Sequence, residues 1–175
     1  AQAQARAQAQ ARAQAQSEAE RLAADNEEKR RFGKKWMKYI KLYKLPASSL
    51  AEKASDPEEA LLGVICQGAR APTVRHRYNF WEHYDRYLTL MGVREEGMEM
   101  GRILDYVSAL KAEPCTVGKL TESHNALAFL EDSGGIREDL RICNSPIYKG
   151  NYEEAVQHLR RVRLESLGDS EPRGK

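Results

Sequence analysis

Cysteine is scarce and long apolar runs are absent in this chain of 175 residues. The cysteines Cys66, Cys115 and Cys143 are odd in number and follow no Cys-x-x-Cys or Cys/His spacing, which argues against a disulfide framework and a zinc site. No stretch approaches the roughly 18 apolar residues that span a bilayer, and no charged-then-apolar start suggests a secretory signal. We therefore expect a soluble, intracellular protein with no metal, no cofactor and no membrane partner.

Catalytic signatures are missing as well. The sequence contains no Gly-rich phosphate loop, no Ser/His/Asp order and no acid pair in a catalytic context. His76 and His83 are seven residues apart on an expected helix, about 10 Å in rise, too far to share a metal. A lone tyrosine such as Tyr148 is no nucleophile without an arginine-histidine set to bind a phosphate. The sequence predicts neither a catalytic residue nor a small-molecule ligand in this chain.

The N-terminal end is of low complexity. Residues 1–16 alternate alanine with Gln or Arg, a period of two that makes no apolar stripe on a helix. The tract is predicted to be disordered, as solvated coil or frayed helix, which fits the low mean hydropathy of −0.70. Residues 17–45 are predicted to form a helical arm that is first acidic and then basic. Because no methionine precedes Met37, we expect the chain to be a piece of a longer reading frame.

The basic half of this arm, residues 29–44, contains eight Lys or Arg and no acid, interleaved with aromatic and aliphatic residues. It can serve as a phosphate-binding arm or a nuclear-localisation signal. Trp36, Tyr39, Ile40 and Tyr43 lie three or four residues apart, which also fits a calmodulin-type target or a membrane-surface helix. A third interpretation is a solvated helix whose apolar side packs on the domain. The sequence leaves all three open.

The rest of the chain predicts an all-α bundle of about five helices, a core of residues 46–166 followed by a polar linker, 167–175. Asp56 and Thr73 are the expected N-caps of two of them, another starts near Thr116, and Gly92 and Pro114 are the expected stops of two. No strand pattern is evident. The expected helices cover residues 57–68, 73–91, 98–113, 116–134 and 152–167.

Three of these helices follow one another in a recognisable order. Thr73…Trp81…Tyr84…Leu88 is followed by Ile103-Leu104-Asp105-Tyr106-Val107-Ser108-Ala109-Leu110, and then by Lys119-Leu120…Asn125-Ala126-Leu127-Ala128-Phe129-Leu130…Gly135-Ile136. This succession resembles the N-terminal, SAM-like core-binding domain of tyrosine recombinases and phage integrases. The resemblance implies a DNA-binding module that grips one face of a recombination site, with homo-oligomers forming on DNA through the last helix. The catalytic domain of the family is absent from these residues, so whether the parent protein is an enzyme stays open.

The resemblance also implies which residues contact double-stranded DNA. The first helix would present Thr73, Arg75, His76 and Asn79, and the fourth Lys119, Thr121 and Ser123. Arg75 and Lys119 would contact phosphates or guanine, and Asn79 adenine. Glu122 adds a carboxylate to that face, where we expect it to repel phosphates.

A second interpretation makes the bundle a protein-interaction scaffold whose basic segment, residues 29–44, is a localisation signal or a calmodulin target. In a eukaryotic cell the basic run would predict a nuclear location, and otherwise a cytoplasmic or nucleoid one. The domain itself is slightly acidic, because residues 45–115 carry a charge of −3 and residues 116–175 carry −1. DNA binding therefore requires cations gathered on one face.

Overall fold

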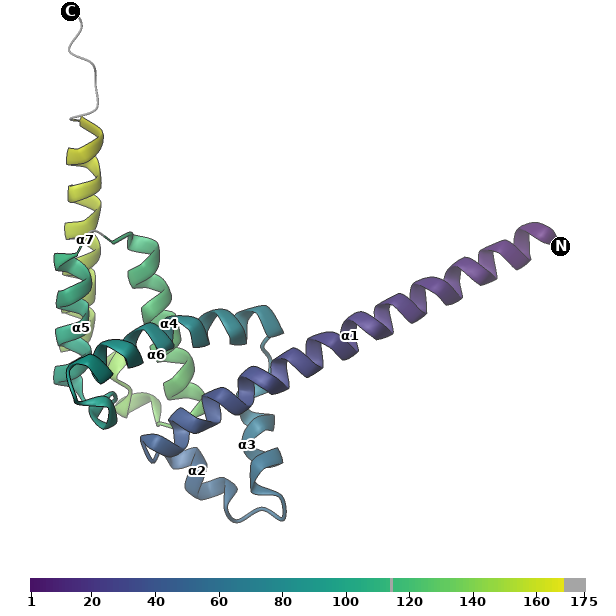
Figure 1. Cartoon of the computed structure of the whole chain (residues 1–175), viewed down its shortest axis with the longest axis horizontal. Coiled ribbons are helices and arrows are strands. Elements are labelled where there is room, and N and C mark those ends of the chain that lie inside the picture. Colours follow the sequence, from purple (N-terminus) through teal and green to yellow (C-terminus); the bar gives the residue numbers. More distant parts are fainter. Residues whose placement is uncertain (114, 169–175) are drawn as a thin grey trace, which may run out of the picture.

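The computed structural model describes residues 1–113 and 115–168, and in this part of the chain every regular element is helical. The prediction of an all-α bundle is confirmed. Figure 1 shows the elements in order. The α-helices are α1 (Gln2–Leu42), α2 (Pro46–Ala51), α3 (Pro57–Cys66), α4 (Ala71–Leu90), α5 (Met100–Ala112), α6 (Val117–Ser133) and α7 (Pro146–Gly168), and the 3-10 helices are η1 (Arg94–Glu96), η2 (Glu138–Leu140) and η3 (Ile142–Asn144).

Helix α1 is a single helix of 41 residues, and its N-terminal part stands away from the bundle (Figure 1). The tract 1–16, predicted to be disordered, is helical from Gln2 onward. Alanine, glutamine and arginine are all good helix formers, so their backbone preference is satisfied without an apolar stripe. The missing stripe shows in the packing instead, because all side chains of residues 1–24 are exposed.

The basic run belongs to the folded core and is not a separate arm. Its apolar residues are buried, and Trp36 is fully enclosed, with its indole Nε1 donating to the carbonyl oxygen of Val74 at 3.1 Å. The predicted boundary at residue 46 is therefore misplaced. The folded unit begins within α1, because one side of the basic segment supplies core residues. These are Phe32, Trp36, Met37, Tyr39 and Ile40.

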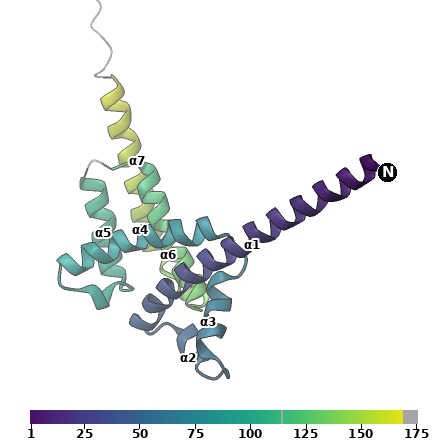
Figure 2. The same cartoon turned by 45° about the vertical axis from the view of Figure 1, so that its right-hand side comes forward.

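Helices α4 and α6 pack against each other at the centre of the molecule. Helix α1 lies against α4 on one side, with α2 and α3 packed beneath it, and α5 and α7 lie side by side on the other (Figures 1 and 2). Between Lys119 and Glu131 no residue of α6 is exposed. An aromatic cluster joins the three central helices: the Trp36 ring centroid lies 5.0 Å from that of Phe129 and 6.4 Å from that of Trp81.

Most helix ends follow the sequence signals. The Asp56 side chain accepts from the backbone N–H of Glu59 at 3.3 Å, so this predicted cap is confirmed. Thr116 Oγ1 accepts from the backbone N–H of Lys119 at 3.2 Å, at the predicted start of α6. Gly92 follows α4 with a φ of +71°, the left-handed conformation that glycine tolerates. Pro114 lies outside the described residues.

Three boundaries differ from the prediction. Thr73 is not a cap, because α4 begins at Ala71 and places Thr73 in the first turn. Helix α7 starts at Pro146, well before the predicted 152, and the short α2 was not expected at all. Proline is the first residue of α2 and α7 and the second of α4. In the first turn it needs no N–H partner and has a suitable φ, a start signal that apolar periodicity does not show.

Candidate nucleic-acid interface

The outer face of α4 carries the residues predicted to contact DNA. Arg75, His76 and Asn79 are exposed, whereas Thr73 is half-buried. Arg75 and His76 are already engaged with acids. Arg75 forms an ion pair with Glu28 of α1, and His76 Nε2 lies 3.2 Å from Glu122 Oε2 of α6. Among the predicted α4 residues, Asn79 is the one that is exposed and has no contact with a carboxylate within the described chain.

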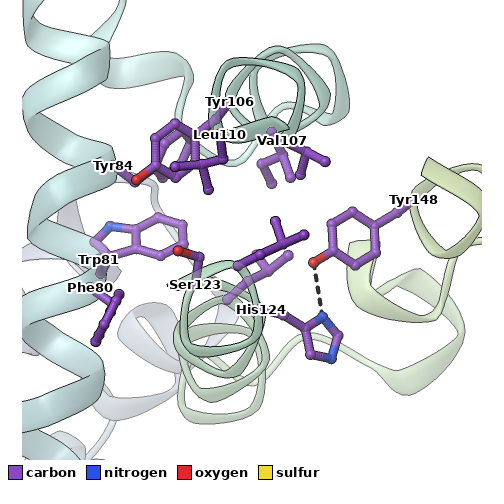
Figure 3. A pocket seen from close by; sticks show the side chains of 12 residues that line it. Phe80, Trp81, Tyr84, Tyr106, Val107, Leu110, Ser123, His124 and Tyr148 are labelled. Atoms are coloured by element: carbon purple, nitrogen blue, oxygen red, sulfur yellow. Dashed lines mark hydrogen bonds between the residues drawn. The ribbon is translucent and has the colours of Figure 1, made fainter. Parts of the chain in front are cut away.

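The predicted residues of α6 are placed differently. Lys119 is half-buried in the first turn. The Thr121 hydroxyl donates to the Val117 carbonyl oxygen at 3.0 Å and accepts from the Tyr152 hydroxyl at 3.3 Å. Ser123 Oγ donates to the Lys119 carbonyl oxygen at 2.8 Å and lies on the inner side of α6 beside a cavity (Figure 3). Because α6 is the central helix, the structure does not bring Thr121 and Ser123 to the outer surface.

Part of the predicted site is nevertheless assembled. The contact between His76 and Glu122 joins the N-terminal halves of α4 and α6. His83 lies one helical turn beyond Asn79. Burial lowers the pKa of His83, and the positive charge of Lys119 lowers it further. Glu122, expected to repel phosphates, is paired with a histidine instead. His76 thus contacts Glu122 where α4 meets α6, and Lys119 of α6 is near enough to His83 to lower its pKa.

A second and more strongly cationic surface lies on α1, and we name it the cation face. It consists of exposed side chains three or four residues apart on the side of α1 opposite Trp36 and Ile40. Over three helical turns it spans about 15 Å. Its members are Arg31, Lys34, Lys35, Lys38 and Lys41.

Carboxylates leave most of the cation face unneutralised. Lys34 Nζ lies 3.8 Å from Glu58 Oε1 of α3, and this is the ion pair that the face makes within the described residues. The neighbouring Arg30 pairs with Glu59. On α4, by contrast, Arg75 and Arg86 are paired with acids, and Arg77 is half-buried over the Phe129 ring. Unpaired positive charge is thus concentrated on α1 rather than on the helix that the sequence motifs favoured.

Aromatic rings hold one of these cations in place. The Lys35 ammonium lies 4.8 Å from the Phe32 ring centroid and 5.4 Å from that of Tyr78 on α4. The Arg31 guanidinium lies 5.2 Å from the Phe32 ring centroid. Such cation–π contacts are worth about 0.5–1 kcal/mol at exposed sites, and they order the side chains. Through Lys35, the cation face contacts Tyr78 of α4.

The structure distinguishes among the interpretations of the basic run. Its apolar residues pack in the core of this domain, as the third interpretation expected. A calmodulin-type target or a membrane-surface helix needs that apolar side to be available, so neither fits the folded chain. The sequence signal for the cation face was present, because cations at 31, 35, 38 and 41 alternate with buried residues at 32, 36 and 40.

A small cavity lies between α4, α5, α6 and α7 (Figure 3). It measures about 30 Å³, room for a water molecule or two, and is lined mainly by aromatic and aliphatic side chains. At its edge His124 Nδ1 and the Tyr148 hydroxyl are hydrogen-bonded at 2.9 Å. Burial lowers the pKa of His124 and raises that of Tyr148. The cavity is a packing feature and is too small for an organic substrate.

The described residues form neither a metal-binding group nor a membrane-spanning helix. No group of three His, Cys, Asp or Glu side chains there is placed to hold a metal ion. None of the helices in that part combines the length and apolarity that crossing a membrane requires.

Comparison of the chain with protein-family models, curated proteins and solved structures found no match. Its function must therefore be inferred from its own surface.

Proposed function

We propose that this chain is a DNA-binding module that contacts the phosphate backbone through the cation face of α1. The observation that carries the proposal is the set of four cations, Arg31, Lys35, Lys38 and Lys41, that share one face and have no acidic partner among the described residues. Each cation that neutralises a phosphate releases condensed counterions, which supplies most of the affinity of non-specific DNA binding.

The support beneath the cations favours this role. The opposite side of α1 is fixed in the core by Trp36 and Ile40, both fully buried. The cations therefore project from a rigid helix, and their spacing is set before DNA arrives. A preformed array loses less conformational entropy on binding than a disordered basic tail does. The lack of a free apolar side leaves charge as the main property of this surface.

Helices α4 and α6 have a smaller part in the proposal than the sequence suggested. Asn79 is exposed and can reach base edges, where an amide pairs best with adenine. Lys119 adds a phosphate contact from α6. Arg75 can join only by exchanging its ion pair with Glu28 for a phosphate. Base contacts would then supply specificity and the cation face most of the affinity.

Membership of a tyrosine-recombinase-type protein is a further part of the proposal and rests on the order of the helix motifs. The exposed apolar residues Val162 and Leu164 near the end of α7 favour the homo-oligomer that this family implies. Inspection of the gene beyond the codon for Lys175 tests the assignment. An open frame with the Arg…Lys…His-x-x-Arg…Tyr pattern would support it, and a stop codon or an unrelated domain would refute it.

Salt-dependent binding to a short duplex tests the DNA-binding proposal. We expect the double variant Lys35→Glu with Lys38→Glu to weaken binding, and to reduce the slope of log K against log salt by about 2 between about 50 and 200 mM. The matched control is Arg160→Glu with Arg161→Glu, which makes the same charge change on exposed residues of α7. Circular dichroism verifies that both variants are folded. Equal losses in the two variants, or no binding by the wild type, would refute the proposal and favour a scaffold.

A further inference from the structure

The first part of α1 is a long helix that nothing in the described chain covers. Residues 2–24, here called the free segment, expose every side chain, and the first hydrogen bond that ties α1 to another helix is made by Asp25. The free segment extends about 35 Å from the bundle, and Figures 1 and 2 show it clear of the other helices from both directions. Its whole length is accessible to a partner.

Charge is unevenly distributed along the free segment. Residues 2–16 carry Arg6 and Arg12 and no acid, whereas residues 17–24 carry Glu18, Glu20 and Arg21, a net charge of −1. Arg6 and Glu20 make no ion pair within the described residues, and Glu20 accepts only the Gln16 amide at 3.2 Å. They are fourteen residues apart, just under four helical turns, so both lie on the same face.

We propose that the partner of the free segment is the free segment of a second copy of this chain, paired with it antiparallel. Overlap along the whole free segment places Ala13 opposite its counterpart. It also places Arg6 of each copy opposite Glu20 of the other, so two complementary ion pairs form around one two-fold axis. The same face carries the short side chains of Ala9, Ala13 and Ser17 between the two charges, which lets the backbones approach.

Charge selects the antiparallel orientation over the parallel one. A parallel pair in register would place Arg6 against Arg6 and Glu20 against Glu20, and like charges opposed across a helical interface select against that pairing. Antiparallel helix dipoles attract, whereas parallel ones repel. The pairing is independent of the function proposed for the cation face.

Because exposed ion pairs are individually weak, we expect a moderate, salt-sensitive dimer. Sedimentation velocity over a concentration series measures it. Arg6→Glu should raise the dimer dissociation constant about tenfold, and so should Glu20→Arg, whereas the two changes together should restore it. The matched control Arg12→Glu changes the same charge on another side of the helix and should have a smaller effect.

A disulfide test gives the geometry directly. Under mild oxidation Ala13→Cys should form a covalent dimer, because the antiparallel pair brings the two residues together. Ala3→Cys should not, because its counterpart would lie about 30 Å away along the helix axis. A wild type that stays monomeric at all concentrations would overturn the proposal. So would a dimer that is indifferent to Arg6→Glu, or covalent dimers formed equally by both cysteine variants.

Discussion

The Asp25 carboxylate on α1 accepts a hydrogen bond from the backbone N–H of Ala71, the first residue of α4, at 3.3 Å. Helix α4 has no side-chain cap of its own, because Arg70 occupies the N-cap position. A residue distant in sequence therefore satisfies one of its free N–H groups and places a negative charge at the positive end of the helix dipole. Asp25 marks the point where the free segment ends and the folded unit begins.

Substitution of this capping residue should destabilise the protein measurably. We expect Asp25→Ala to lower the free energy of unfolding by about 1 kcal/mol, the usual cost of losing an N-cap. Glu27→Ala is the control, because Glu27 is exposed and two residues away. Urea denaturation of both variants measures the difference. Equal stability of the two would show that Asp25 does not cap α4 in solution.

Trp36 tests whether the basic run is part of the core. Its side chain is fully buried, and its indole donates to Val74. Trp36→Ala should cost about 3–5 kcal/mol by removing a large buried side chain and leaving a cavity. Lys38→Ala, two residues away on the exposed side, should change stability by less than about 0.5 kcal/mol. A Trp36→Ala variant as stable as Lys38→Ala would mean that residues 29–44 form a detached arm after all.

Glu131 is a fully buried acid with a structural role. Its two oxygens accept the backbone N–H groups of Ile142 at 2.6 Å and Cys143 at 3.0 Å, so it holds η3 against α6. We expect Glu131→Ala to cost about 1–3 kcal/mol, since both buried donors lose their partner. Hydrogen exchange of these two amides should accelerate more than exchange at Glu59, whose cap is distant. Unchanged protection at Ile142 and Cys143 would contradict this role.

His124 should make stability fall in mildly acidic solution. Burial lowers its pKa below the ordinary 6.5, so the unfolded chain binds a proton more tightly than the folded one. The stability that the protein gains by keeping His124 neutral is fully present above pH 6.5. It is lost as pH falls through the folded-state pKa of His124. Urea midpoints measured across this range should fall less for His124→Gln, which keeps a partner for Tyr148. Parallel curves for wild type and variant would exclude His124 as the cause.

Cys143 should be a poor nucleophile in the folded protein. Burial, followed by its hydrogen bond to Glu131, raises the pKa of the thiol from 9.0 to about 11. Because the thiolate is the reactive form, alkylation at about pH 8 should be about 100-fold slower than in denaturant. Mass spectrometry of the peptide that contains Cys143 gives both rates. Equal rates would show that η3 opens freely.

The sequence signals that proved reliable were local ones. Asp56 was predicted to cap α3 because a short polar side chain precedes Pro57 and an apolar pattern, and it accepts the backbone N–H of Glu59. Thr73 looked the same in sequence. Helix α4 nevertheless begins two residues earlier, at Ala71, and its first N–H is capped by Asp25 of α1, which is 46 residues away in sequence. Contacts of this kind depend on the packing of whole helices and leave no trace in the local pattern.

The candidate site was harder to predict for a related reason. The exposure of Arg75, His76 and Asn79 was correct, because their periodicity on α4 fixes the outer face. Periodicity could not reveal that acids from two other helices would reach this face. Glu28 contacts Arg75, and Glu122 contacts His76. Nor did it show that α6 would be covered on nearly all sides, which turned Thr121 and Ser123 inward. Charge compensation between helices is a property of the assembled bundle.

Helix α1 also fixes the position of its own N-terminal end relative to the core, because it is continuous from Gln2 to Leu42. A continuous helix rises about 1.5 Å and turns about 100° per residue, so whatever adjoins residue 2 is held at a set distance and azimuth from the core. One additional Ala-Gln pair in the tract would move that end outward by about 3 Å and rotate it by about 200°. Gain or loss of a repeat unit would thus reverse the direction in which an attached group points. The phase of this repeat, and not only its length, is a property on which selection can act.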